Sequence, residues 1–322
     1  MVAPNINYGE ATVMTLNKLR PKIHDNVTSH AALLRRLKKK GNMSKEDGGR
    51  EIQHDLEYAE NQTVKRYSGY EILDISPSDV FTAVTFPWRQ MAVAVTMSGL
   101  EDLINSGNSA RYNQWGKRID NAVKSITNAI ASDVYSDGTA DGGKQIGGLQ
   151  LLVPDNPLNT VGGIDANVWD FWRNTVYSFA ANGVTPGSNR IQAAMNATYL
   201  NTTRGSDTVD LIVADNTYYT YYWESLQAIQ RITSSDGSAQ AGYASLKFMG
   251  ADVIFDGGLW GYAPPGMYFL NTDYLYFCTH KDRDFVPLDK RGSINQDATT
   301  QLITWAGNMG ITNRILQGRI VD

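Results

Sequence analysis

The chain has 322 residues, which exceeds the size at which one hydrophobic core usually stops growing, so we expect two lobes. Hydrophobic residues make up 42% of the sequence and aromatic residues 10%, a content that excludes a wholly disordered chain. The net charge of −4 conceals an asymmetry, because residues 1–50 hold 10 Lys and Arg against 4 Asp and Glu, which leaves a balance of −10 for the remainder.

Export and membrane insertion find no support in the sequence. Cys278 is the only cysteine, so no disulfide can form within the chain and a thiolate metal site cannot be built. The N-terminus lacks the basic and apolar segments of a signal peptide, and no apolar run approaches the about 20 residues of a membrane span. We therefore expect a protein that contacts no membrane.

Residues 1–48 are mostly polar and contain one predicted helix, from His30 to Lys40, which Gly41 ends. A short leucine stripe (Leu33, Leu34 and Leu37) lies beside a cluster of cations: Arg35, Arg36, Lys38, Lys39 and Lys40. Such a helix buries too little to be a domain, so we interpret the segment as an arm that lies on another surface. The cations suit either nucleic acid or the acidic body of a neighbouring copy, and we favour the neighbouring copy because no aromatic residue is interleaved for base stacking.

After Arg50, apolar residues recur at every second position, a pattern that indicates a β-hairpin. Alternate residues from Ile52 to Tyr58 form one apolar face, residues 59–69 form a polar tip, and residues 70–75 are predicted to be the returning strand. Isolated hairpins are marginally stable in water, so a ribbon of this kind needs a partner surface, for which another chain is a candidate.

The central part of the chain predicts a half-buried strand over 91–97, a short helix between Gly99 and Gly107, and then a long helix. The long helix spans about 28 residues over 108–136, because apolar residues recur at steps of three and four. These residues are Tyr112, Trp115, Ile119, Val123, Ile126, Ile130 and Val134.

A Gly-rich and Pro-rich passage, 138–163, leads to a second lobe in which helices and strands are interleaved without a regular βαβ repeat, so we predict an α+β fold. The predicted helices are 168–181, 188–203 and 217–232, and the predicted strands are 210–214, 245–255, 267–278 and 300–320.

Catalytic motifs are weak. Residues Gly138 to Gln145 approach the phosphate-binding pattern G-x-x-x-x-G-K-[ST], but Gln145 stands where the pattern needs the Ser or Thr hydroxyl that ligates Mg²⁺. The loop also follows a predicted helix and leads into an extended stretch, 149–153, whereas the pattern lies between a strand and a helix. The four histidines show no metal-ligand spacing, and Asp282 and Asp284 lie in a charged run typical of a solvated turn.

The aromatic cluster 218–223 has the spacing of residues on the core-facing side of a helix. We predict no catalytic, cofactor-binding or metal-binding residue.

A set of phrases in this order resembles the major capsid proteins of tailed phages with the HK97-like fold. They are Ala32-Leu-Leu-Arg-Arg-Leu-Lys-Lys-Lys-Gly41, Gly48-Gly49, Tyr67-Ser-Gly-Tyr70, Phe86-Pro-Trp-Arg-Gln90, Tyr135-Ser-Asp-Gly138, Ile146-Gly-Gly-Leu149, Val161-Gly-Gly-Ile-Asp165, Phe171-Trp-Arg-Asn174 and Asn313-Arg-Ile-Leu-Gln-Gly318. The similarity extends over nearly the whole chain.

The resemblance implies an N-terminal arm (1–48), an E-loop hairpin (49–85), a peripheral domain (86–150) with a spine helix at about 108–136, an axial domain (151–285), and C-terminal strands (286–322) that return to both lobes. It implies copies that assemble into hexamers and pentamers of an icosahedral shell around double-stranded DNA. It also implies a location in the virion after assembly in the host cytoplasm, with a portal and decoration proteins as further partners.

The inter-subunit contacts that we expect are those of the arm and of the hairpin: Arg35, Arg36, Lys38, Lys39, Lys40, Lys65, Arg66, Tyr67 and Tyr70. Lys65 lies at the hairpin tip, but no Asn or Glu matches the other roles of the isopeptide cross-link found in some relatives. Because the arm follows Met1 directly, a separate scaffolding protein, or none, is expected. The alternatives are a nucleic-acid-binding protein that uses the basic arm, and a nucleotide-binding enzyme that uses the loop 138–145.

Overall fold

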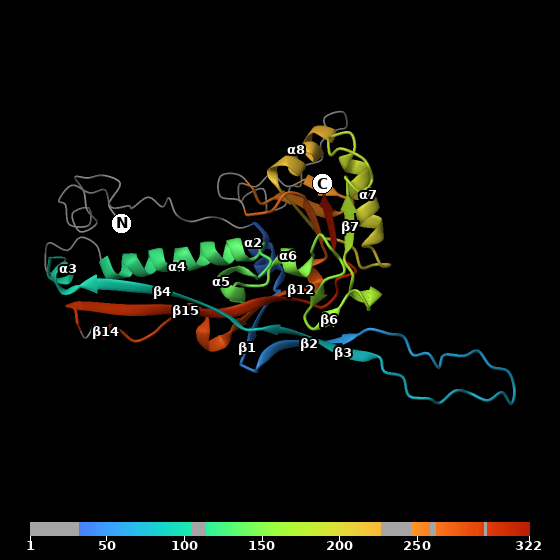
Figure 1. Cartoon of the computed structure of the whole chain (residues 1–322), viewed down its shortest axis with the longest axis horizontal. Coiled ribbons are helices and arrows are strands. Elements are labelled where there is room, and N and C mark those ends of the chain that lie inside the picture. Colours follow the sequence, from blue (N-terminus) through green and yellow to red (C-terminus); the bar gives the residue numbers. More distant parts are fainter. Residues whose placement is uncertain (1–31, 105–113, 227–245, 258–261, 293–294) are drawn as a thin grey trace.

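The computed structural model describes residues 32–104, 114–226, 246–257, 262–292 and 295–322. Its body consists of two six-stranded sheets, and a two-stranded ribbon with a long loop projects from it (Figure 1). None of the helices within the described ranges has the length and hydropathy that a membrane span requires.

The first sheet is built on two long strands, β4 (Arg89–Ser98) and β15 (Ala298–Ile311), which pair antiparallel from Arg89↔Gly307 to Ser98↔Ala298. The opposite edge of β15 pairs with β12 (Leu275–His280), β13 (Val286–Pro287) and β14 (Arg291–Gly292), and β1 (Met43–Glu46) runs parallel to β12. Val95 and Met97 of β4 are buried while their neighbours Ala94 and Thr96 are exposed, so the predicted half-buried strand is confirmed.

The long helix α4 (Gln114–Asp133) lies along β4 and β15 (Figure 1). Its apolar stripe faces the sheet as predicted, with Ile126 and Ile130 buried. Residues 108–113 of the predicted helix lie outside the described residues. The described helix ends three residues before Ser136, because the backbone N–H groups of Tyr135 and Ser136 bond to carbonyls three residues back and tighten the last turn.

At its other end, α4 is held to the short helix α3 (Gly99–Ile104) by an ion pair. Arg118 donates to both carboxylate oxygens of Glu101, at 3.0 Å and 3.1 Å, and also to the carbonyl oxygen of Thr96. Two parallel hydrogen bonds between a guanidinium and a carboxylate fix the relative orientation of the two groups better than a single charge pair does.

The second sheet has the order β7 (Thr175–Ser178), β16 (Gly318–Val321), β11 (Met267–Leu270), β8 (Leu211–Ala214), β10 (Ala251–Phe255) and β9 (Leu246–Phe248). Helices α7 (Ile191–Asn201) and α8 (Asn216–Ser225) cover one face of it. Alternate residues of β8 point to opposite sides, so Ile212 and Ala214 contact these helices while Leu211 and Val213 belong to the core shared with the first sheet. The strand 210–214, the helix 188–203 and the described part of the helix 217–232 are thereby confirmed.

Several sequence expectations for this half of the chain are wrong. Residues 168–181 form a 3₁₀ turn, η2 (Asp170–Trp172), followed by β7, because Thr175 to Ser178 pair in parallel with β16 and this pairing overrides the helical pattern. Residues 149–153 are not extended but form α6 (Leu149–Leu152), which directs Leu149 and Leu152 into the core together.

Three predicted strands are each two strands. Residues 245–255 turn at Met249 and Gly250, both with positive φ, to form the antiparallel pair β9 and β10. Residues 267–278 comprise β11 and β12, separated by η4 (Thr272–Tyr274), and residues 300–320 comprise β15 and β16. In the last two cases the strands belong to different sheets, so the chain crosses from one sheet to the other at both places, and neither sheet follows the predicted domain limits at 150 and 285.

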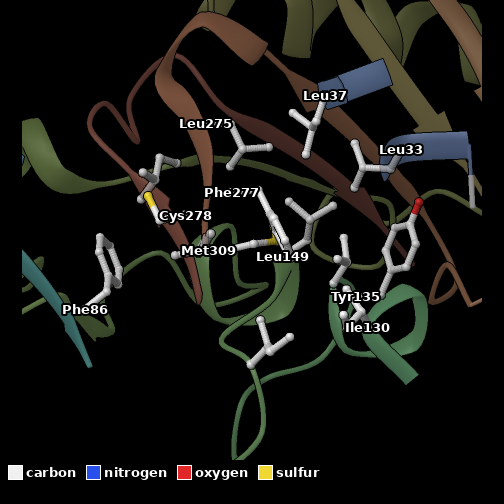
Figure 2. Packing of buried hydrophobic residues seen from close by; sticks show 14 of the residues in the cluster. Leu33, Leu37, Phe86, Ile130, Tyr135, Leu149, Leu275, Phe277, Cys278 and Met309 are labelled. Carbon is white, nitrogen blue, oxygen red and sulfur yellow. The ribbon is translucent and has the colours of Figure 1, made fainter. Parts of the chain in front are cut away.

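The two sheets share one core at their junction, where the arm helix α2 (Ala32–Lys40) is inserted (Figure 2). Leu33 and Leu37 of this helix are fully buried and belong to the same cluster as Tyr135, Leu275 and Phe277. The described part of the predicted helix 30–40 and its leucine stripe are confirmed.

Leu37→Ala should lower the free energy of unfolding by about 2–5 kcal/mol, because it leaves a cavity at a fully buried position between the sheets. Lys38→Ala, one residue away on the exposed side of α2, should change it by no more than about 0.5 kcal/mol. Urea unfolding of the two variants and the unchanged chain measures the difference; equal midpoints for both variants would show that α2 contributes no core packing.

Candidate assembly surface

The arm helix is held to the body by charge as well as by its leucines. Arg36 pairs with Asp252 of β10 at 2.8 Å, and the Lys40 ammonium lies 3.0 Å from Asp210 and 2.8 Å from Asp273. Partial burial opposes the Lys40 charge, but the hydrogen bonds to Asp273 and Asp210 outweigh it, so the pKa of Lys40 is raised.

A buried carboxylate receives the N-terminal end of the described helix. Asp256, directly after β10, accepts hydrogen bonds from the backbone N–H groups of Ala32 and Leu33, and Tyr135 donates its hydroxyl to Asp256 Oδ2 at 2.6 Å. Burial raises the pKa of Asp256, while these hydrogen bonds favour its charged form. One side chain thus connects the arm, the residues that follow α4 and the second sheet.

We expected the basic arm to meet an acidic body mainly between chains, and the structure shows that two of its cations have acidic partners within their own chain. Arg36 and Lys40 have their charge partners in the same chain, because burial of Leu33 and Leu37 brings them over the acidic edge of the second sheet. Arg35, Lys38 and Lys39 lie on the exposed side of α2, and their role in inter-subunit contacts stays a prediction.

The ribbon consists of β2 (Glu51–Glu57) and β3 (Phe81–Pro87). Residues 70–75, predicted as the returning strand, do not pair with β2; the partner is β3, with Ile52 opposite Phe86 and His54 opposite Val84. Val84 and Phe86 are buried together with Ile52, so the strand that completes the ribbon is the one that contributes to the core.

The ribbon is anchored where Gly162 meets β3. Thr85 N–H donates to the Gly162 carbonyl oxygen at 3.1 Å, and a Cβ on Gly162 would lie 2.0 Å from Val84 Cγ2. Gly162 also has φ of +60°, so both the close approach and the backbone conformation require glycine.

Residues 58–80, the projecting loop, extend from this ribbon away from the body (Figure 1). The loop is closed at its base by a hydrogen bond from Tyr58 N–H to the Val80 carbonyl oxygen at 3.0 Å. Its apolar side chains are exposed to an unusual degree, with Tyr70 fully exposed and Ile72 and Ile75 more than nine-tenths exposed. Clustered exposed apolar side chains of this kind indicate a contact surface.

The four predicted contact residues of the hairpin all lie exposed in the projecting loop. Lys65 pairs with Glu71 at 3.3 Å within the loop. Val64, Ile72 and Ile75 are exposed in the same loop and were not among the predicted contact residues. The expected pairing of residues 70–75 with the strand after Arg50 concealed that they have no partner strand to bury them.

At the base of the ribbon, His54 packs against β12. Its ring stacks on Tyr276 with centroids 5.1 Å apart, and its Nε2 lies 4.0 Å from Cys278 Sγ, to which the Ser44 hydroxyl also donates at 3.0 Å. Burial lowers the pKa of His54 and raises that of Cys278, so the imidazole is held neutral and the thiol protonated.

The loop 138–145 has the wrong geometry for a phosphate cradle. It forms the short turn α5 (Ala140–Gly143) after α4, with no strand before it, and the Gln145 amide donates to Asp133 at 2.7 Å. Asp284 pairs with Lys45 at 2.8 Å, as suits a solvated turn. No group of three or more His, Cys, Asp or Glu side chains in the described ranges is arranged to hold a metal ion.

The aromatic cluster 218–223 forms a core face, as the sequence predicts. Tyr218 and Tyr222 of α8 are buried against the second sheet, and the Tyr222 hydroxyl donates to the Lys247 carbonyl oxygen at 2.9 Å. Burial raises the pKa of Tyr222 to about 12. Tyr218 and Tyr222 therefore contribute packing to the second sheet.

Solved phage capsid structures share this architecture over nearly the whole chain. The cyanophage A-1(L) capsid asymmetric unit superposes with a TM-score of 0.68 at 15% identity, covering 94% of this chain and 96% of the other. The capsid of an empty GTA particle superposes with a TM-score of 0.61 at 12% identity over 99% of each chain, and a Mycobacterium phage Bobi chain with 0.57 at 12% identity over 97% of each. No family model matches the chain, and no curated protein matches it in sequence.

These likenesses establish the fold. The α+β, HK97-like fold that the sequence predicts is confirmed, because the superpositions extend over 94% and 99% of the chain.

His54 makes the stability of the ribbon base depend on pH. Because its folded pKa lies below the usual 6.5, the unfolded chain binds the proton first, so stability falls as the pH drops from about 6.5 through the folded pKa. His54→Gln should remove this part of the slope. Urea unfolding of both proteins at about pH 7.5 and about pH 5 tests it; the same loss of stability in both would exclude His54 as the group responsible.

Proposed function

We propose that the chain is the major capsid protein of a tailed double-stranded DNA phage, a structural subunit whose copies associate into a closed shell around the genome. The observation that carries the proposal is the superposition of nearly the entire chain on subunits of phage capsids. Within this proposal, copies form hexamers and pentamers of an icosahedral shell, which is assembled in the host cytoplasm. Portal, scaffolding and decoration proteins are its further partners.

The projecting loop supports the proposal on physical grounds. A 23-residue excursion that exposes Val64, Tyr70, Ile72 and Ile75 is unfavourable for a protein that acts alone in water. Burial of such side chains against another subunit stabilises the assembly by about 25 cal/mol for each Å² of apolar surface removed from water. We therefore assign residues 49–85 as the E-loop that lies over an adjacent subunit.

The remaining regions follow in the same terms. We assign residues 1–48 as the arm, the first sheet with α4 as the peripheral domain, and the second sheet with α7 and α8 as the axial domain. Because the chain crosses between the sheets after β11 and after β15, these domains are defined by sheet and not by continuous sequence.

The two alternatives lose support. The nucleic-acid-binding alternative loses two of the five cations of the arm, because Arg36 and Lys40 are engaged by Asp252, Asp210 and Asp273. Arg35, Lys38 and Lys39 stay exposed. A nucleotide-binding loop needs a strand before the glycines and a hydroxyl after the lysine, and the loop 138–145 has neither.

The purified chain, expressed alone or with a scaffolding protein, should form capsomers or shells. Analytical ultracentrifugation and negative-stain electron microscopy measure this directly. A chain that stays monomeric at all salt and crowding conditions tested would contradict the proposal.

Excision of the projecting loop should abolish assembly and spare the fold. Because Tyr58 and Val80 are already hydrogen-bonded, residues 59–79 can be replaced by Asn-Gly, which closes a two-residue hairpin. Thermal unfolding should be nearly unchanged, while the assembled fraction in ultracentrifugation should fall to background.

Point variants test whether assembly depends on the apolar side chains of the loop, because they leave its length unchanged. Ile72→Ser with Ile75→Ser should impair assembly, because both side chains are exposed in the single chain and their burial is available only between chains. A control with two polar positions changed, Gln62→Ser with Ser68→Ala, should assemble normally. Normal assembly of the excised chain would remove the E-loop assignment.

A further inference from the structure

A groove lies at the base of the projecting loop and has an aromatic floor. Tyr58, Trp169 and Phe171 contact one another, with ring centroids 5.4 Å apart for Tyr58 and Trp169 and 5.7 Å for Tyr58 and Phe171. Trp169 is 45% exposed and Phe81, which also lines the groove, is 73% exposed. Exposed tryptophan and phenylalanine in a concave site indicate a surface that another group covers.

The same groove is acidic. Asp79 and Asp165 line it, and within the described residues neither carboxylate forms an ion pair. The arginine nearest to Asp165 in sequence is already engaged, because Arg173 pairs with Asp170 and donates to the carbonyl oxygens of Ala166 and Asn167. Carboxylates beside aromatic faces suit a guanidinium, which can stack on a ring while it pairs with an oxygen.

The projecting loop carries an arginine that matches this site. Arg66 is exposed between the apolar or aromatic residues Val64 and Tyr67, and no ion pair involves it among the described residues, whereas its neighbour Lys65 pairs with Glu71. The loop runs away from its own base (Figure 1), and half of its length in extended form spans about 36 Å. Its tip is therefore placed to reach the groove of another copy and not its own.

We propose that the groove formed by Tyr58, Trp169 and Phe171 binds the loop segment 64–67 of a second copy, with the guanidinium of Arg66 against the aromatic floor and paired with Asp79 and Asp165. The inference rests on the proposed function, since it names the surface that one subunit offers to the loop of the next. The loop of one copy and the groove of the next are different surfaces, so each copy contributes its loop to one neighbour and its groove to another. Repetition of this contact around a ring closes the assembly.

Charge reversal tests the pairing. Arg66→Glu should reduce the rate or yield of assembly by about tenfold or more, because it places like charges together in the groove. Asp79→Arg should do the same, and the double variant R66E with D79R should recover much of the lost assembly. Lys144→Glu, a reversal at an exposed position of the α4 to α6 connection, should have little effect. Single reversals without effect, or a double variant no better than either single one, would overturn the inference.

Cysteine cross-linking tests the location of the contact directly. Arg66→Cys with Asp79→Cys should give disulfide-linked dimers and higher oligomers on oxidation of assembled shells, with a matched pair of Arg66→Cys and Lys144→Cys giving none. The native Cys278 is buried and so contributes little background. Denaturing gels without reductant measure the products.

The outcomes separate the inference from the proposed function. Shells that form normally but show no 66–79 cross-link would overturn the inference and leave the capsid proposal standing; the groove would then have another occupant. Failure of the unchanged chain to form any shell would remove the capsid proposal itself. Circular dichroism of each variant distinguishes a lost contact from a lost fold.

Discussion

The seating of the arm helix between the two sheets is the interaction on which the other parts of the molecule depend. Leu33 and Leu37 fill the junction of the shared core, and Asp256 accepts hydrogen bonds from the backbone of Ala32 and Leu33 and from the Tyr135 hydroxyl. A buried carboxylate is costly unless it is fully hydrogen-bonded, so the arm, the residues after the long helix and the second sheet are tied together by a group that tolerates no missing partner. The chain then continues from α2 directly into β1 of the first sheet.

A second buried charge holds the point at which the chain returns from one sheet to the other. Arg314, between β15 and β16, is fully buried and donates to the carbonyl oxygen of Leu152 and to the Asn174 side chain. Burial without a carboxylate partner lowers its pKa to about 10, yet the group remains charged at neutral pH. These hydrogen bonds hold the connection between β15 and β16 against the chain around Leu152 and Asn174, and the ribbon and loop extend from the body (Figure 1).

Apolar side chains are buried to different extents in the body and in the projecting loop. Within the body most leucine, isoleucine and phenylalanine side chains belong to the two buried clusters, whereas in the projecting loop Tyr70, Ile72 and Ile75 face water. An isolated chain gains nothing from this exposure, but a chain that associates with its copies gains the burial of that surface each time a contact forms. The contacts within the loop are polar: short turns at Asn61 with Thr63 and at Asp74 with Ser76, and the ion pair of Lys65 with Glu71. These contacts leave the apolar side chains of the loop exposed.

The class of fold, the long amphipathic helix, the half-buried strand 91–97, the leucine stripe of the arm and the buried strand 210–214 could all be predicted from the sequence. Each depends on a local period of apolar residues that burial then satisfies. Which strands share a sheet could not be predicted in this way, because it depends on contacts between distant segments. Residues 70–75 have the composition of a strand, but β3 pairs with β2 because Val84 and Phe86 reach the core; residues 175–178 become a strand because β16 lies beside them. Likewise the charge asymmetry between arm and body was evident from composition, but the partners Asp210, Asp252 and Asp273 were set by folding. Pairing and docking depend on residues far apart in the chain, which local patterns do not encode.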